Sequence, residues 1–451
     1  MPQPLARILA EHFAAAPAQP EPKLAEMKRL LTDFVGVGLA GSQADTGQLV
    51  GQFVTSVGGA PEASLIGSGA RVPMMHAAFA NAISEHSVEL DDVDELALFH
   101  YAPVIMSTAL AVGQATRASG AEVLSAALSG AEMMARLSRA TNSALRDRGF
   151  HTTPTCGVFG ATVTAGRLLG LDADQLTSAL GLAGAQASGL MEMYGTSMQK
   201  RFNPGPAARN GVVAAQLAKI GFTGADTIID GERGFAQSFA GFLDPEPLTA
   251  GLGEDVPVFV EYKPYSCARP IHNAIDCALE VRPHVQGRLD DIKRLVVKRH
   301  PDWAHYHVIG RPRTFHEAQV SLPYAVAVAL IEGQALPAQF SSPILEDERV
   351  QNLSAIVEVE PDDSLARGVS CHLQLELTDG TVHESVVDSP RGSLANPLDD
   401  EALLAKSTSL GAPVVGADRF AEIARVVGSF EKVDSVDELM DLLVAEGADR
   451  G

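Results

Sequence analysis

Helix-forming patterns rich in alanine and glycine fill the first half of this 451-residue chain and restrict its fold more than any other feature. In residues 22–41, apolar side chains recur at helical spacing, and the glycines among them leave room for another helix to approach. Similar patterns, separated by turn signals, recur at residues 46–58, 73–84, 103–118, 121–140, 155–169, 174–189 and 206–220. Because they show no fixed repeat period, we expect a bundle-like domain rather than a solenoid.

The pattern changes near residue 257, where β-branched and alternating segments begin. Extended structure is predicted at residues 257–263, 295–300, 355–360 and 371–383, with a hairpin turn at 378–381. Helices predicted at 270–286, 317–332 and 343–350 interleave with these strands, and the helical pattern returns from about residue 398. The expected fold is therefore mainly α. A large helical domain, residues 1–262 plus 395–451, carries an inserted, smaller α+β domain, residues 263–394, which the family resemblance given below describes as a lid.

Length, charge and cysteine usage restrict the class of protein. The chain exceeds the usual size of one domain, which also favours two domains. Its formal net charge of -22 argues against nucleic acid or an anionic membrane as a partner. No apolar run is long enough to span a bilayer and the N-terminus does not resemble a signal peptide, so a cytoplasmic protein is expected. The four cysteines lack CxxC spacing, so neither a disulfide framework nor a zinc site is expected.

A cluster of acids lies between two histidines in residues 86–100. The acids are Glu89, Asp91, Asp92, Asp94 and Glu95, and the histidines are His86 and His100. Such a run is commonly a solvated helix end, but this one lies between two apolar helices. Carboxylates beside a histidine can hold one imidazole tautomer and tune its pKa. We therefore predict that the acids support His100. No metal site is expected, because the acids lack the partners of a closed site.

Two further segments place polar residues just before predicted helices. His151 follows Gly149, where a helix start offers free N–H groups to an anion; an ordinary loop histidine is the alternative. Lys200 and Arg201 are adjacent cations in a segment bounded by Gly195 and Gly205. Because like charges disfavour each other, Lys200 is expected to have a lowered pKa and to act as a base or a carboxylate clamp. A surface loop is the alternative there.

The junction with the smaller domain gathers further reactive side chains. Cys267, Arg269 and His272 occur together, and a thiol flanked by cations can have a lowered pKa. Taken alone, however, the cysteine is better interpreted as a structural thiol. Tyr324 lies in a helix started by Pro323. Its hydroxyl can cap a neighbour or donate to a carboxylate.

Taken in order, these motifs resemble the MmgE/PrpD family, which includes 2-methylcitrate dehydratases, cis-aconitate decarboxylases and an iminodisuccinate epimerase. The resemblance runs nearly end to end. It rests on residues 86–92, His100, residues 149–151, Lys200 with Gly205, Lys263-Pro264 with His272, residues 322–327, and residues 390–398. It implies a helical domain with an α+β lid, a homodimer, and no metal or organic cofactor.

The chain departs from the family pattern at three places. Glu89 replaces the usual aspartate, Tyr101-Ala102-Pro103 follows His100 in place of Pro-Gly, and Asn203 stands where a histidine is common. All three lie in the regions on which decarboxylase and dehydratase assignments depend.

The resemblance implies proton abstraction beside a carboxylate, with cations holding the enolate-like charge. The catalytic candidates are Lys200, His100, His151, Cys267 and Tyr324; the substrate-binding candidates are Glu89, Asp91, Asp92, Arg201, Arg269 and His272. We expect a cofactor-independent lyase for a small di- or tricarboxylate, either 2-methylcitrate dehydratase-like or cis-aconitate decarboxylase-like. One alternative is an epimerase of an amino-dicarboxylate, iminodisuccinate epimerase-like, that uses Lys200 and Cys267 as two opposed bases. A non-catalytic carboxylate-binding relative is the third possibility.

Overall fold

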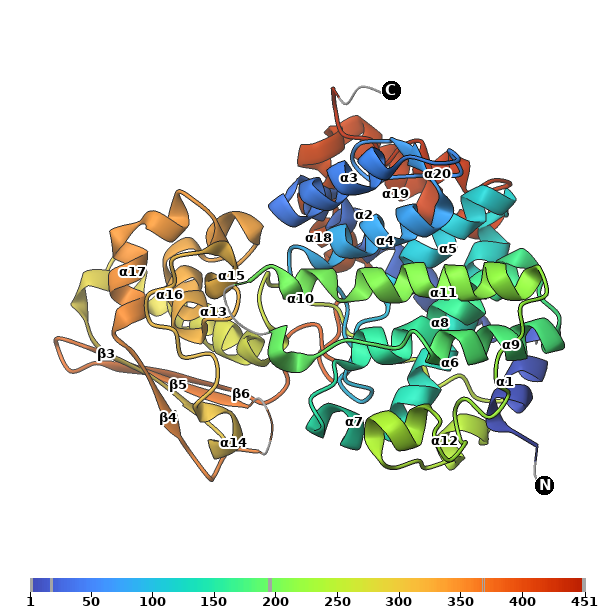
Figure 1. The fold of residues 1–451 in the computed structure, drawn as a ribbon. Helices are drawn as coiled ribbons and strands as arrows, with labels where there is room; N and C mark the ends of the chain where they lie inside the picture. The colour runs from blue at the N-terminus through green and yellow to red at the C-terminus, as the bar shows by residue number, and fades with distance from the viewer. Residues whose placement is uncertain (1–2, 17–18, 194–196, 367, 369, 448–451) are drawn as a thin grey trace.

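The computed structural model describes residues 3–16, 19–193, 197–366, 368 and 370–447, and its elements are mostly helices (Figure 1). The mainly helical class predicted from the sequence is confirmed. Between the N-terminus and residue 249, the structure contains a short hairpin, β1 (Ala63–Ser64) and β2 (Arg71–Val72), and twelve α-helices among the described residues. The helices are α1 (Leu5–Ala14), α2 (Glu21–Gln43), α3 (Asp45–Val57), α4 (Met74–His86), α5 (Ala102–Thr116), α6 (Gly120–Thr141), α7 (Ala144–Asp147), α8 (Thr152–Leu169), α9 (Ala173–Gly184), α10 (Gln199–Phe202), α11 (Pro204–Lys219) and α12 (Glu246–Thr249).

The C-terminal helices pack back onto the N-terminal ones. They are α18 (Asp400–Val415), α19 (Ala417–Gly428) and α20 (Asp437–Met440), drawn in red beside the blue helices α2 and α3 in Figure 1. A Cβ atom built at Gly36 of α2 would lie 2.6 Å from the Cα of Ser407 in α18. Glycine at this position therefore permits the two helices to touch, as the sequence pattern predicts.

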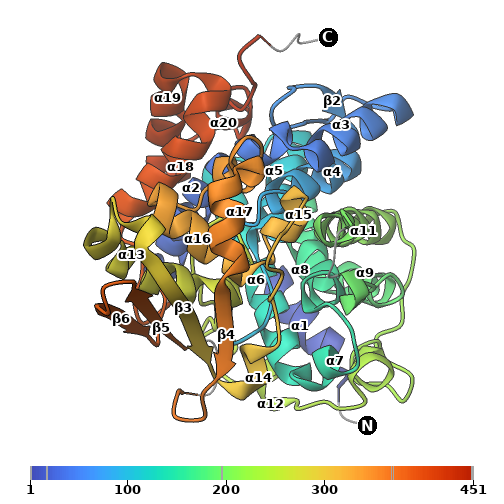
Figure 2. The ribbon, with the colours of Figure 1, turned by 90° about the vertical axis from the view of Figure 1, so that its left-hand side faces the viewer.

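The smaller unit is built on a four-stranded sheet with the order β4-β3-β5-β6. Its strands are β3 (Ile292–Arg299), β4 (Val357–Pro361), β5 (Cys371–Leu377) and β6 (Val382–Val387). β3 is parallel to β4 and antiparallel to β5, and the predicted turn at 378–381 joins β5 to β6. Its helices are α13 (His272–Val285), α14 (Pro301–Ala304), α15 (Phe315–Ala318), α16 (Leu322–Glu332) and α17 (Glu348–Ala355) (Figure 2). Side chains of β5 alternate between full and partial burial, so one face of this sheet is covered more completely.

Three predicted elements differ from the structure. Residues 257–263 form no strand: they contribute one isolated bridge, between Val93 and Glu261. The helix predicted from residue 317 is divided, because the side chain of Ser321 accepts the backbone N–H of Tyr324 and starts α16 there. The helix predicted at 343–350 is a 3-10 turn (Ile344–Glu346) followed by α17.

Two hydrophobic clusters correspond to the two parts of the chain. The first contains buried residues from Ala6 to Tyr262 and again from Leu398 to Leu443; the second runs from Tyr265 to Leu377. The two chain crossings are hydrogen-bonded to each other, because the N–H of Tyr262 donates to the carbonyl oxygen of Gly392 at 3.0 Å. On this basis we propose the domain boundaries expected above, 1–262 plus 395–451 and 263–394.

Candidate functional site

The acidic stretch forms a buried loop between α4 and α5 rather than a solvated helix end. Glu89, Asp91 and Asp92 are each 0% exposed. Asp92 directs its two oxygens at the first backbone N–H groups of α5, at 2.8 Å from Tyr101 and 2.7 Å from Ala102. Burial raises the pKa of Asp92 to about 8. The contacts of Asp92 thus position the loop against a helix start instead of facing a ligand, which differs from the substrate-binding role expected for it.

Asp91 joins two imidazoles and a lysine. One of its oxygens lies 2.7 Å from Nδ1 of His86 and 3.0 Å from Nδ1 of His100, and the other accepts from Nζ of Lys263 at 3.0 Å. Although burial opposes ionisation, His100, His86 and Lys263 hold the pKa of the Asp91 carboxyl well below its usual value. Asp91 therefore supports His100, as expected from the sequence.

His100 is held as a neutral imidazole. Burial lowers its pKa to about 3, so its ring is uncharged at neutral pH. Its Nδ1 faces both Asp91 and the carbonyl oxygen of Asp92, which fixes the proton on that nitrogen. The other nitrogen, Nε2, carries the lone pair, and the side chain remains 12% exposed. His100 can therefore accept a hydrogen bond from a ligand.

Glu89 is surrounded by three cations. One of its oxygens accepts from Lys200 and Arg201, and the other lies 3.3 Å from Nζ of Lys263. Burial opposes ionisation of the Glu89 carboxyl, but Arg201, Lys200 and Lys263 outweigh burial and hold its pKa well below the usual value. We call Lys200, Arg201 and Lys263, with Glu89 and Asp91, the cation cluster. The cluster joins segments that are more than one hundred residues apart in the sequence.

Lys200 lies in the short helix α10, where it is 8% exposed. Burial lowers the pKa of its ammonium group to about 8, and the nearby Arg201 adds to this effect, while Glu89 opposes it. The lowered pKa expected for Lys200 is present, but burial is its largest cause rather than the adjacent arginine. Gly195, which bounds the predicted loop, lies outside the described residues.

His151 belongs to the same region. It occupies the N-cap position of α8 without a side-chain capping bond, is 6% exposed, and its Nδ1 lies 3.0 Å from Nδ2 of Asn203. Burial lowers the pKa of His151 well below its ordinary value, and His86, His100 and Lys200 contribute to that shift. A second neutral imidazole thus lies within the electrostatic reach of Lys200.

The remaining candidates lie at the junction or in the smaller core. Arg269 pairs with Glu95 at 2.7 Å and with Glu261 at 3.2 Å. His272 is fully buried, with Nε2 3.2 Å from the carbonyl oxygen of Cys267.

For Tyr324 and Cys267, the contacts match the structural alternative considered for each of them. The hydroxyl of Tyr324 donates to the carbonyl oxygen of Gln339 at 2.7 Å inside the second hydrophobic cluster, so it caps a neighbour. Burial raises the pKa of the Cys267 thiol, although Lys263, Arg269 and Lys200 act in the opposite direction. The lowered pKa considered for Cys267 is therefore absent, because flanking cations do not compensate for the loss of hydration, and the residue fits a structural thiol.

Lys263 was absent from the candidate residues and is central to the cluster. Its side chain is 1% exposed and reaches both Glu89 and Asp91. Although burial favours the neutral amine, Asp91 and Glu89 raise the pKa of Lys263, so it stays charged. The available signal was the Lys263-Pro264 pair next to the domain junction.

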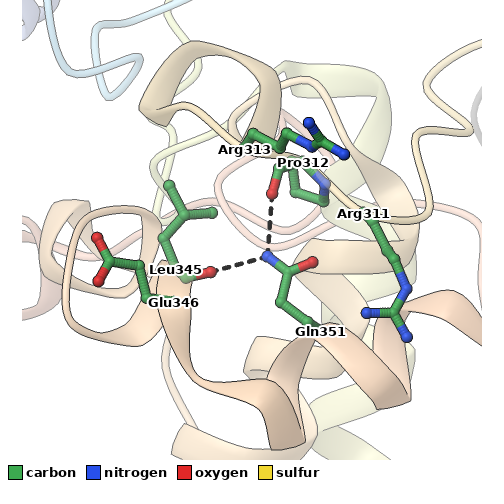
Figure 3. Close-up of a pocket in the computed structure, with 6 residues that line it drawn as sticks. All are labelled: Arg311, Pro312, Arg313, Leu345, Glu346 and Gln351. Carbon is green, nitrogen blue, oxygen red and sulfur yellow. Dashed lines mark hydrogen bonds between the residues drawn. The ribbon is translucent and has the colours of Figure 1, made fainter.

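A surface hollow of about 380 Å³ lies elsewhere, in the smaller unit (Figure 3). Gln351 crosses it and donates to the carbonyl oxygens of Pro312 and Leu345, while Arg311, Arg313 and Glu346 complete the lining. It contains none of the candidate residues. Within the described residues, no three His, Cys, Asp or Glu side chains gather as a metal site, and no helix has the length and apolar character needed to cross a membrane.

The sequence of this chain matches two protein-family models and several known proteins. The model of the MmgE/PrpD N-terminal domain matches residues 6–247, and that of the MmgE/PrpD C-terminal domain matches residues 265–431. The cis-aconitate decarboxylase-like protein oryM of Aspergillus oryzae is 28% identical over 95% of this chain and 94% of its own length. The cis-aconitate decarboxylase of Homo sapiens is 26% identical over 92% and 89%, respectively. The 2-methylcitrate dehydratase-like protein oryR of Aspergillus oryzae is 26% identical over 62% and 61%. Because the two domain models together cover most of the residues, this chain belongs to the MmgE/PrpD family.

Proposed function

We propose that this protein is a lyase that removes CO2 or water from a small di- or tricarboxylate without a cofactor. The observation that carries the proposal is the buried cation cluster, in which Lys200 has a pKa of about 8. Relatives that span nearly the whole chain are named cis-aconitate decarboxylases, and a further one is named 2-methylcitrate dehydratase-like.

The cluster supplies the groups that both lyase reactions require. In dehydration, a base takes the proton beside a carboxylate, and the electron pair then expels hydroxide, which takes up a proton. In decarboxylation, the electron pair of the broken carbon–carbon bond stays on the organic product, which takes up a proton. Lys200 can exchange a proton near neutral pH, and Arg201 and Lys263 stabilise the negative charge that develops.

An epimerase with Lys200 and Cys267 as opposed bases has less support. A base must be available in its deprotonated form near neutral pH, whereas burial raises the pKa of the Cys267 thiol. No other contact of Cys267 favours that reaction over a lyase.

The test incubates the purified protein separately with cis-aconitate, citrate, 2-methylcitrate and iminodisuccinate. A chelator is present in every sample. We expect release of CO2, or formation or loss of an alkene seen by ultraviolet absorbance and NMR. When the reaction is run in D2O, a decarboxylation product should also contain solvent deuterium at the carbon that lost CO2, whereas the alkene formed by dehydration should not. A change of optical rotation alone would instead identify an epimerase, and the absence of any reaction would refute the proposal.

Two further features remain proposals. We propose a homodimer, on the resemblance described above, and a cytoplasmic location, as expected from the sequence. A stripe of exposed apolar side chains on α3 supports association: Leu49, Phe53 and Val57 are 54%, 55% and 52% exposed. They lie four residues apart and so on one face of the helix.

A further inference from the structure

Gln319 of the smaller unit uses its whole side-chain amide on contacts at the edge of the cation cluster. It directly follows α15 and is 0% exposed. Its Oε1 accepts a hydrogen bond from Nη2 of Arg201 at 2.7 Å. Its Nε2 donates to the carbonyl oxygen of Val88 at 3.0 Å and to Oγ of Ser266 at 3.1 Å. Because Arg201 and Val88 belong to the helical unit, one side chain of the smaller unit holds two points of its neighbour.

These two points lie on either side of Glu89. Val88 directly precedes Glu89 in the chain, and Arg201 donates to the Glu89 carboxylate. The backbone of Glu89 has φ of +56°, a left-handed conformation that a glutamate adopts only where its surroundings hold it there. Gln319 therefore fastens both the loop that carries this carboxylate and the guanidinium group that binds it.

The orientation of the Arg201 guanidinium depends on two contacts. Nη1 donates to Glu89 and Nη2 donates to Gln319, whereas the buried Nε has no hydrogen-bond partner among the described residues. The charge of Arg201 matters for Lys200, which donates to the same oxygen of Glu89. Arg201 is one of the groups that lower the pKa of Lys200 to about 8. The position of one guanidinium thus affects the ionisation of the proposed base.

Glutamine suits this position because its amide both donates and accepts without carrying a charge. A carboxylate could bind Arg201, but it would face the carbonyl oxygen of Val88 with no proton to donate. An ammonium or guanidinium group could donate to Val88, but it would repel Arg201. The contacts of Gln319 therefore require an amide of this length.

We propose that Gln319 is a positioning residue, which holds the Arg201 guanidinium beside Lys200 and thereby arranges the cation cluster for catalysis from the smaller unit. It acts on the reaction through Arg201 and through the loop of Glu89. This inference rests on the proposed function, because it assumes that the cation cluster carries out the reaction. It makes the chemistry depend on contact between the two units.

The titration of Lys200 tests this role without a substrate. It is followed by NMR in protein labelled with 13C in its lysine side chains, and the signal is identified by its loss in Lys200→Arg. Gln319→Met has a similar length but forms none of the three hydrogen bonds. Arg201 is then no longer held beside Lys200, so the pKa of Lys200 should rise. Gln319→Glu adds a negative charge beside Arg201 and should raise that pKa further, by about one pH unit in total.

Steady-state kinetics on the substrate that the protein turns over is the second measurement. Gln319→Met should lower kcat/KM by roughly ten- to a hundredfold, the size of one hydrogen bond to a charged group. Ser266→Ala removes only the hydroxyl that accepts from Gln319 and should lower kcat/KM by about two- to tenfold, the size of a bond between neutral groups.

Gln351 provides a matched control. Its amide donates to the carbonyl oxygens of Pro312 and Leu345, so its bonds stay inside the smaller unit (Figure 3). Gln351→Met and Gln351→Glu make the same chemical changes as at Gln319, away from the cation cluster. Both variants should leave the titration of Lys200 and kcat/KM unchanged.

An unchanged titration of Lys200 in both Gln319 variants, or near-normal kcat/KM in Gln319→Met, would overturn the role of Gln319. If these variants do not fold, Ser266→Ala decides by the same two measurements, and values equal to those of the unaltered protein would overturn it. Absence of turnover in the unaltered protein would instead reject the proposed function, and the titration would still decide on Gln319.

Discussion

The Lys200 side chain combines a positive charge, burial and contact with Glu89, so its replacement should affect turnover more than that of any other single residue. Lys200→Ala should reduce kcat by about 10²–10⁴-fold, the usual contribution of a proton-transfer group. Lys200→Arg keeps the charge but cannot release its proton at neutral pH, so it should retain activity only if Lys200 is a clamp. Steady-state assays of both variants, with Lys432→Ala as an exposed control, measure this. Near-normal turnover in both variants would transfer the chemistry to His100 and His151.

The pH dependence of the reaction should report the ionisation of Lys200. A base acts in its deprotonated form, so kcat/KM should rise with pH and level off above about 8, where the lysine loses its proton. His100 should not contribute near neutrality, because its pKa is about 3. The profile is measured with a substrate whose own carboxyl groups ionise well below pH 6. A fall in kcat/KM above pH 8 would show that the protonated lysine is the active form.

The surroundings of a single residue were predictable where its neighbours in the sequence reveal them. Lys200 was identified from its position beside Arg201, and the support of His100 by acids followed from their shared segment. The raised pKa of the Cys267 thiol was not predictable, because the sequence shows the flanking cations but not the burial that removes water from the thiol. The contact between Lys263 and Asp91 spans 172 positions, so no local pattern indicates it.

At the scale of secondary-structure elements, the start of α5 depends on Asp92. Its two oxygens bind the N–H groups of Tyr101 and Ala102, both fully buried. Asp92→Ala should lower the free energy of unfolding by about 1–3 kcal/mol, because the two groups lose their partner and water cannot replace it. Asp92→Asn keeps an acceptor and should lose less. Urea denaturation compares the two variants; equal stability would show that the loop does not depend on these bonds.

Element positions followed the sequence pattern closely where a helix has an apolar face and clear ends. The pattern at 22–41 corresponds to α2, and the alternation at 371–383 corresponds to β5 and the start of β6. The strand predicted at residues 257–263 does not form, because a strand needs a neighbouring strand to pair with. The β-bridge that these residues make joins Glu261 to Val93 alone.

At the scale of the whole molecule, the exposed stripe of α3 predicts self-association. Leu49, Phe53 and Val57 expose apolar surface that a second copy can cover. Sedimentation at micromolar concentration should show a dimer, and Phe53→Glu should shift it toward the monomer because a charge would then be buried at the contact. A monomer in the unaltered protein would contradict the prediction. A dimer that persists in Phe53→Glu would place the contact on another surface.

The sequence predicts only part of the way in which the N-terminal helices, the C-terminal helices and the smaller unit come together. The return of the helical pattern after residue 398 indicated that the tail rejoins the first helices, and Gly36 against Ser407 shows how closely it does so. The sequence did not reveal that both units contribute to one buried cluster. That depends on contacts such as the 2.7 Å bond from Arg201 to Gln319, which only the folded chain creates.

The hydrogen bond between Tyr262 and Gly392 places both covalent connections of the smaller unit side by side, so any rotation of that unit would pivot near this pair. Lys263 follows Tyr262 directly and therefore moves little when the smaller unit turns. Gln319 is carried by that unit alone, and its bonds to Arg201 and to the carbonyl oxygen of Val88 must break if the unit swings outward. We expect residues 315–321 to exchange amide hydrogens faster in the free enzyme than with saturating ligand, whereas Tyr262 should change little.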